Sequence, residues 1–164
     1  MTGGWQVRRA READIPALLR LMTALAVFER YDQAFAVTES VLRVQGFRRD
    51  PPDFVALVAE HEAHGVRGML VFHVVPFALR ARPTLFVKEL YVDADHRGHR
   101  LGEALMRAAA IEARTRGCAL VKWQVARWNA DGARFYERLG ATSDDGWVDY
   151  ALDDAAIARL ADGG

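Results

Sequence analysis

Residues 85–106 combine an apolar segment, a short basic turn with two glycines and an alanine-rich segment. The apolar run is typical of a strand, and the alanine-rich run is typical of a helix. A turn between them directs backbone N–H groups and the positive end of the helix dipole at one point. Arg97 and Arg100 add positive charge that is unfavourable at a helix N-terminus unless an anion binds there. The sequence therefore predicts a phosphate-binding site.

A second block, residues 128–141, could supply acid–base chemistry near the same end of the fold. We expect a helix that begins at Asn129 or Ala130, with Asn129 as its cap, and ends before Gly140. Tyr136 lies on this helix, and its phenol could protonate a leaving group. The alternative is that Tyr136 is a core aromatic, as its neighbour Phe135 is expected to be, but the Phe-Tyr-x-x-x-Gly context favours the catalytic role.

These two blocks require a sheet that brings strand ends together. The hydrophobic pattern predicts strands at 5–9, 54–60, 67–75, 84–92, 119–126 and 147–152. It predicts helices at 12–28, 38–46, 97–116 and 130–139 and in the acidic tail, with a loop at 76–83. This order indicates an α/β fold, a mixed and mostly antiparallel sheet with helices on both faces. The strands 84–92 and 119–126 should be parallel neighbours, because a helix connects them.

Composition limits the class of protein. The chain has 164 residues and no net charge, since 22 basic residues balance 22 acidic ones. We therefore expect one domain over residues 1–164 and no nucleic-acid partner. No apolar run approaches the roughly 18 residues of a membrane span, and no secretory signal is visible, so we expect a cytoplasmic protein without a membrane partner. Cys118 is the only cysteine, which excludes an internal disulfide.

The five histidines show no spacing typical of a metal site. His61 and His64 lie close in sequence but lack a third partner, so we expect no metal.

The two blocks together resemble the GNAT superfamily of acetyl-CoA-dependent N-acetyltransferases. The superfamily's pyrophosphate motif is Arg/Gln-x-x-Gly-x-Gly/Ala, and this chain reads Arg97-Gly98-His99-Arg100-Leu101-Gly102, with arginine at position 100 where glycine is usual. Within the superfamily the chain looks most like the diamine (spermidine/spermine) and thialysine acetyltransferases. That likeness rests on Leu25-Ala26-x-Phe28-Glu29, Thr38-Glu39, Gly46-Phe47, Val125-Ala126-x-Trp128-Asn129, Phe135-Tyr136-x-Arg138-x-Gly140-Ala141 and Gly146-Trp147.

The resemblance implies a GNAT fold, acetyl-CoA as co-substrate, a small-molecule amine substrate and a homodimer. It implies cofactor contacts from Leu90, Tyr91, Val92, Arg97, Gly98, His99, Arg100, Leu101, Gly102, Glu103 and Asn129. It also implies that a backbone N–H among residues 90–92 stabilises the oxyanion, and that Tyr136 reprotonates the leaving thiolate. Substrate contacts are implied for Phe28, Glu29, Lys88, Trp128 and Asp145.

The general base is the open point. Lys88-Glu89 stands where the diamine acetyltransferases have Glu-Asp, so lysine occupies the family's glutamate position. Neighbouring strand residues face opposite sides, so Glu89 could replace that carboxylate only if a bulge turns it. Glu89 could instead pair with an arginine, and a water chain or a neutral substrate could then serve. Lys88 would repel a polyamine, which favours an amine that also carries a carboxylate.

We therefore predict an N-acetyltransferase that works by direct attack in a ternary complex. Cys118 lies at the wrong end of its strand to serve as a covalent nucleophile. Two alternatives stay open: an enzyme that acetylates a protein lysine or N-terminus, and a CoA-binding sensor or interaction module with weak or no catalysis.

Overall fold

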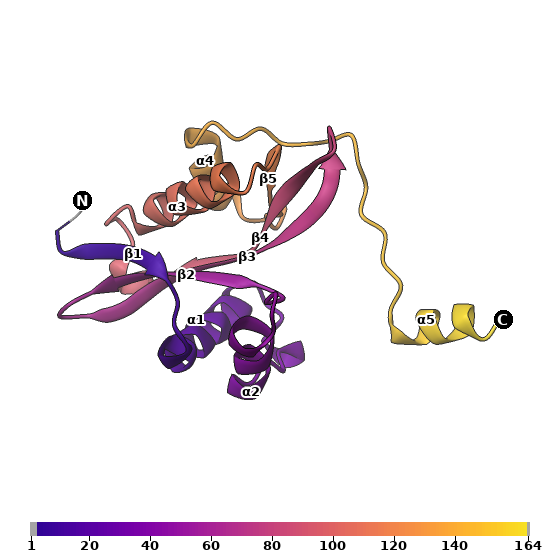
Figure 1. The fold of residues 1–164 in the computed structure, drawn as a ribbon, viewed down its shortest axis with the longest axis horizontal. Helices are drawn as coiled ribbons and strands as arrows, with labels where there is room; N and C mark the ends of the chain where they lie inside the picture. Colours follow the sequence, from indigo (N-terminus) through magenta and orange to yellow (C-terminus); the bar gives the residue numbers. More distant parts are fainter. Residues whose placement is uncertain (1–2, 164) are drawn as a thin grey trace. The chain divides into compact units, whose positions relative to one another are not determined.

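The structure, a computed structural model, describes residues 3–163. It contains two compact units, which divide between Trp128 and Asn129. The first unit holds the sheet and the two longest helices, and the second holds two further helices (Figure 1). The expectation of a single domain stays a prediction.

The sheet of the first unit has five strands in the order β1-β2-β3-β4-β5. The strands are β1 (Trp5–Arg9), β2 (Val55–His61), β3 (Gly65–Leu79), β4 (Arg82–Val92) and β5 (Leu120–Lys122). The first four are antiparallel neighbours. The last pair is parallel, with Thr84 opposite Leu120. The predicted mixed, mostly antiparallel sheet and its parallel pair are confirmed.

Helices cover both faces of this sheet, as predicted (Figure 1). α1 (Ile15–Phe28) and α2 (Glu39–Arg43) lie on one face and α3 (Leu101–Thr115) on the other. Short helical segments are η1 (Glu12–Asp14), η2 (Asp32–Ala34), η3 (Val44–Arg48) and η4 (Ala94–His96). Thr38 caps α2 as expected, because its hydroxyl accepts a hydrogen bond from the Val41 amide.

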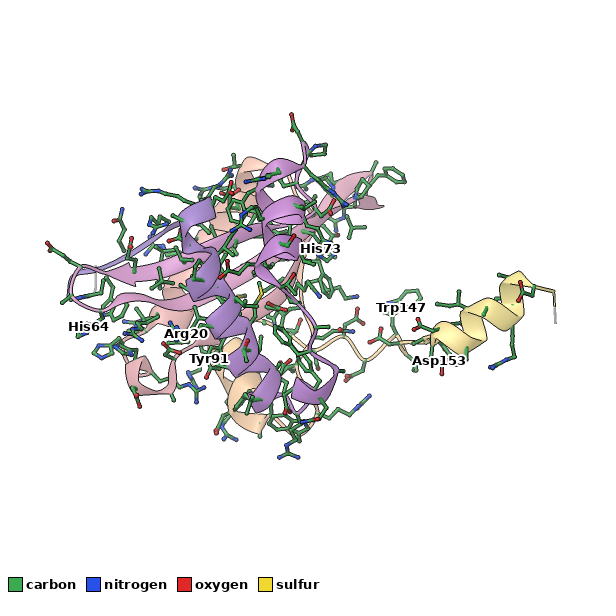
Figure 2. All side chains as sticks on the ribbon, turned by 90° about the horizontal axis from the view of Figure 1, so that it is seen from below. Arg20, His64, His73, Tyr91, Trp147 and Asp153 are labelled. Atoms are coloured by element: carbon green, nitrogen blue, oxygen red, sulfur yellow. The ribbon has the colours of Figure 1, made fainter. Side chains whose placement is uncertain are left out.

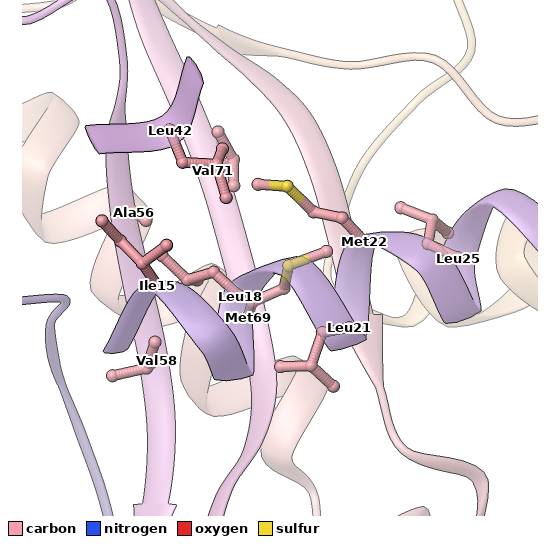
Figure 3. Close-up of a cluster of buried hydrophobic side chains, with 10 residues drawn as sticks. All are labelled: Ile15, Leu18, Leu21, Met22, Leu25, Leu42, Ala56, Val58, Met69 and Val71. Atoms are coloured by element: carbon pink, nitrogen blue, oxygen red, sulfur yellow. The ribbon is translucent and has the colours of Figure 1, made fainter. Parts of the chain in front are cut away.

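The strand period of two sorts the core side chains between the faces. On the α1 face the side chains form one buried cluster (Figure 3): Ile15, Leu18, Leu21, Met22, Leu25, Leu42, Ala56, Val58, Met69 and Val71. On the other face Leu105 of α3 packs against Gly68, where an added Cβ would lie 3.2 Å from the Leu105 Cδ1. Gly68 thus lets α3 approach the sheet closely.

The predicted loop at 76–83 is wrong. β3 continues to Leu79 and β4 begins at Arg82, so the strands form one long hairpin. Pro76 and Phe77 lie in a register shift between Val75 and Leu79, where the missing N–H of a proline disturbs no ladder bond. Arg80 and Ala81 then form the turn with φ of 55° and 56°, the conformation of tight hairpins.

Two predicted strands differ from the structure. The strand predicted at 119–126 is ordered only as β5, because its pairing with β4 ends at Phe86 and a bulge in β4 follows. The strand predicted at 147–152 is wrong. Residues 129–163 contain the helices α4 (Ala130–Arg138) and α5 (Asp154–Ala161) and no strand. Alternating side chains alone do not make a strand, because the backbone needs a hydrogen-bonded partner.

Candidate active site

The basic turn begins the site. α3 starts at Leu101, four residues after the predicted start at 97, because Gly98 and Arg100 have φ of 87° and 58°. No side chain caps this helix end. The first amides of α3 have no acceptor within the helix, so they are available to an anion. The turn therefore fits the pyrophosphate of a coenzyme.

Arg100 makes a different contact from the one expected. Its guanidinium donates to both carboxylate oxygens of Glu103, at 2.9 and 2.8 Å. The two residues are predicted cofactor contacts, and the structure pairs them with each other on an exposed surface. A phosphate would have to compete with Glu103 for the arginine.

Arg97 connects the turn to the sheet and to the end of α1. Its Nε donates to the Val92 carbonyl at 3.3 Å. Its guanidinium carbon lies 5.6 Å from the centroid of the Tyr91 ring and 5.5 Å from that of Phe28. Such contacts hold a cation over aromatic faces. Three residues predicted from different segments are thereby brought together.

Residues 90–92 have a free edge. Leu90, Tyr91 and Val92 pair with β3, opposite Leu70, Met69 and Gly68. β5 pairs only with residues 84–86, so in the described part of the chain no strand pairs with 90–92 on that side. Backbone N–H and C=O groups on an unpaired strand edge can bind an extended ligand.

A β-bulge separates Lys88 from Glu89, the predicted site residues of β4. Glu89 pairs with Val71 and Val87 with Phe72, so Lys88 is the extra residue of β4. The Lys88 side chain is exposed, whereas Oε2 of Glu89 is buried and has no hydrogen-bond partner. The bulge that the sequence required for Glu89 to act as base is present.

The surroundings of Glu89 favour its neutral form. Burial raises the pKa of the Glu89 carboxyl, Lys88 lowers it, and the negative charge of Glu29 raises it further. Burial also raises the pKa of Glu29. Tyr31 senses the same charges: burial, Glu89 and Glu29 raise its pKa to about 12. A carboxyl with a raised pKa and a buried oxygen is a suitable general base.

Trp128 contacts residues at the end of α1 and directly after it. Its ring lies 5.6 Å from that of Phe28, and the Arg30 guanidinium carbon lies 4.8 Å from its centroid. Arg30 and Tyr31 were not predicted as site residues. They directly follow the Phe28-Glu29 pair, and the end of α1 at Phe28 makes the next residues turn toward β4. That adjacency was the only signal in the sequence.

The second unit contains the remaining predicted residues. Asn129 caps α4, because its side-chain oxygen accepts a hydrogen bond from the Gly132 amide at 2.9 Å. Tyr136 is half-buried and its ring lies 5.1 Å from that of Phe135. Asp145 is exposed in a segment without regular structure. Catalytic and binding roles for these three residues stay predictions.

Among the described residues, no group of three or more His, Cys, Asp or Glu side chains is arranged to hold a metal ion. None of the helices described is long and apolar enough to span a membrane.

Known proteins are similar to this chain in sequence and in fold. The family model described as Acetyltransferase (GNAT) family matches residues 18–141. Thialysine N-epsilon-acetyltransferase from Mus musculus is 29% identical and the alignment covers 95% of this chain and 96% of that protein. L-ornithine N5-acetyltransferase NATA1 from Arabidopsis thaliana is 24% identical over 83% of this chain and 78% of its own length.

A solved structure has the same fold. An integron cassette protein from the mobile metagenome of V. cholerae superposes with a TM-score of 0.80, at 19% identity, over 97% of this chain and 98% of its own. The family match covers most of the chain, including the turn, β4 and α4. The chain therefore belongs to the GNAT family and is an acetyltransferase.

Proposed function

We propose that this enzyme transfers the acetyl group of acetyl-CoA to the primary amine of a small molecule that also carries a carboxylate. The observation that carries the proposal is the β4 bulge, which buries an oxygen of Glu89 and exposes Lys88. The first residue supplies a base, and the second supplies a positive charge beside it. The proposal extends to a protein that works in the cytoplasm as a homodimer.

The base is needed because the substrate arrives charged. An alkylamine with a pKa near 10.4 is mostly protonated at neutral pH, and the neutral form costs about 4 kcal/mol. Glu89 would accept the proton of the ammonium group. Glu29 and Tyr31 would keep this region attractive to a cation, and the rings of Phe28 and Trp128 would contact its carbon chain.

Acetyl-CoA would supply the acetyl group as a thioester. The amides at the start of α3 and the free edge of Leu90–Val92 would bind its pyrophosphate and its extended arm. Arg97, which lies over Tyr91 and Phe28, would hold the turn close to the predicted substrate residue Phe28. Tyr136 would donate a proton to the departing sulfur.

Lys88 is the basis for the substrate class. Its charge opposes a polycation and can pair with a carboxylate. The relatives named for thialysine and L-ornithine act, by their names, on side-chain amines of amino acids. We therefore place the substrate among amino-acid-like amines rather than among polyamines.

The test measures acetyl-CoA turnover with a panel of amines, detected as release of the free thiol. The panel includes thialysine, ornithine, lysine, spermidine and neutral monoamines, each amino acid as its carboxylate and as its amide. We expect the carboxylate forms to have the higher kcat/KM. Equal kcat/KM for carboxylate and amide would contradict the role of Lys88. Turnover of no free amine, with acetyl-CoA bound, would indicate a protein substrate or a sensor.

Substitutions at position 88 sharpen this test. Lys88→Gln should remove the preference for carboxylates, and Lys88→Arg should retain it. Lys88→Glu should raise kcat/KM for spermidine relative to the carboxylate substrates. A preference that is the same in all four enzymes would place substrate selection elsewhere.

A further inference from the structure

Four of the five histidines gather around one tryptophan. Trp5 of β1 has the rings of four histidines within 5.0 to 6.2 Å of its own: His61, His64, His96 and His99. The His64 ring is also 4.6 Å from His61 and 5.3 Å from His96. We call these four side chains the histidine cluster.

Two segments far apart in sequence, 61–64 and 96–99, supply the histidine cluster. His61 is the last residue of β2 and His64 lies on the turn between β2 and β3, where Figure 2 shows it at the end of the hairpin. His96 ends η4, and His99 lies within the turn that precedes α3. The histidine cluster therefore includes a residue of the phosphate-binding turn itself. The fifth histidine, His73, packs elsewhere, against Phe86.

The ring nitrogens of the four histidines differ in their hydrogen bonds. Nδ1 of His61 accepts a hydrogen bond from the Ala63 amide at 3.0 Å, and its Nε2 lies 3.1 Å from the Gly3 carbonyl. Both ring nitrogens of His61 therefore have a backbone partner. Nδ1 of His96 is buried and has no partner. His64 and His99 are exposed.

Arginines adjoin the cluster, and two of them are paired with carboxylates. Arg67 of β3 donates to the His64 carbonyl at 2.7 Å, and Arg97 and Arg100 lie in the turn beside His99. The acidic Asp93 is already paired with Arg20 and Arg67, and Glu103 with Arg100. Glu62 and Asp95 are sequence neighbours of the histidines. In the described part of the chain, however, no ion pair joins a carboxylate to any of the four rings.

We propose that the histidine cluster is a proton-dependent binding site for a phosphate group of the acetyl donor. This inference rests on the proposed function, in which acetyl-CoA binds at the turn. A phosphate beside His99 would supply the negative charge that the cluster lacks, and the unpartnered Nδ1 of His96 could then gain a hydrogen-bond partner.

Binding should therefore take up protons. In the free protein the pKa of His64 is lowered by partial loss of solvation, by the neighbouring imidazoles and by Arg67. A bound phosphate offsets this repulsion and raises the pKa of His64. Since a ligand favours the protonation state that it stabilises, affinity should rise as the pH falls from about 8 to about 6.

The experiment is calorimetric titration with acetyl-CoA in buffers of different ionisation enthalpy, which counts the protons taken up. It compares the wild type with His64→Gln, His96→Gln and the matched control His73→Gln, each verified by thermal melting. The wild type and His73→Gln should bind about three- to tenfold more tightly near pH 6 than near pH 8. His64→Gln and His96→Gln should lose most of this gain.

A second ligand identifies the phosphate. Acetyl-dephospho-CoA lacks the 3′-phosphate, whose own second pKa is about 6 and would otherwise contribute protons. Equal proton uptake with both ligands assigns the cluster to the pyrophosphate, and uptake that needs the 3′-phosphate and the histidines assigns it to that group. Both outcomes support the proposal.

Binding that neither depends on pH nor takes up protons overturns the proposal and leaves the acetyltransferase function intact. Equal proton uptake in all four proteins overturns it as well. Failure of acetyl-CoA to bind at any pH would instead overturn the proposed function itself.

Discussion

Lys88 and Glu89 are adjacent in sequence, but a β-bulge gives them opposite environments. Lys88 is the unpaired residue of the bulge and is exposed, whereas Glu89 pairs with Val71 and buries its Oε2. In a regular strand the two side chains would simply alternate between faces. The family's glutamate position is occupied by Lys88, and the bulge allows Glu89, one residue later, to supply the carboxylate.

The first prediction concerns this carboxylate. Glu89→Gln keeps the size of the side chain but removes the base, so kcat should fall about 100-fold or more. Because the raised pKa belongs to the base, kcat/KM of the wild type should rise with pH through the Glu89 pKa, above the usual range of a glutamate. This acidic limb should disappear in the variant.

Glu39→Gln is the matched control, since Glu39 lies on α2 and is exposed. It should leave the kcat/KM profile unchanged. Retention of the acidic limb in Glu89→Gln would assign the base to another group.

The second prediction concerns Tyr136, the proposed general acid. Tyr136→Phe removes the phenol and keeps the ring beside Phe135, so the fold should be retained. We expect kcat to fall about 100-fold with little change in the Kd of acetyl-CoA. Steady-state kinetics and calorimetry measure the two quantities. Tyr150→Phe, at a residue that is 95% exposed, serves as the control. Unchanged kcat in Tyr136→Phe would make this residue structural.

The third prediction concerns Arg100, which has a left-handed φ of 58° where the family motif has glycine. Glycine adopts this conformation without steric cost, and alanine does not. Both substitutions remove the exposed ion pair with Glu103, so their difference reports the backbone alone. Arg100→Gly should be more stable than Arg100→Ala by about 1 kcal/mol in urea unfolding.

The same pair of substitutions at Arg107 gives the opposite sign. Arg107 is exposed within α3, where alanine should be more stable than glycine by about 1 kcal/mol. An order at position 100 that matches the order at position 107 would exclude the left-handed conformation.

The fourth prediction concerns the start of α1. Asp14 accepts hydrogen bonds from the two terminal guanidinium nitrogens of Arg8, at 2.7 and 3.0 Å, and from the Arg11 amide at 2.7 Å. Asp14→Asn should therefore reduce the free energy of unfolding by about 2 kcal/mol. The control is the exposed Asp162→Asn, which should change it little.

This contribution also depends on pH. The hydrogen bonds from Arg8 lower the pKa of Asp14 in the folded state. The unfolded state therefore binds the proton first, and the stabilisation is complete above about pH 4 and lost as the pH falls through the folded pKa. Urea unfolding at decreasing pH should show a steeper loss for the wild type than for Asp14→Asn. Parallel curves would show that Asp14 does not contribute.

Much of the fold could be predicted because its signals are local. Strand alternation and helical spacing indicated the elements of the first unit, and the Arg97–Gly102 turn indicated a phosphate site. The errors fall where local patterns compete with pairing. Pro76 entered a strand because a bulge accommodates it, and residues 147–152 alternate without forming a strand.

The sequence by itself determined the chemistry available to this protein: a basic turn before a helix, a carboxylate beside a lysine, and a tyrosine on a short helix. Only the tertiary structure decided how those groups are used. The bulge that separates Glu89 from Lys88 depends on the register of β4 against β3, which no residue in β4 specifies alone. The histidine cluster likewise exists only because β1, the β2–β3 turn and the turn before α3 meet at one end of the sheet. Contacts between distant segments arise from packing of the whole fold, and the local spacing of residues does not specify them.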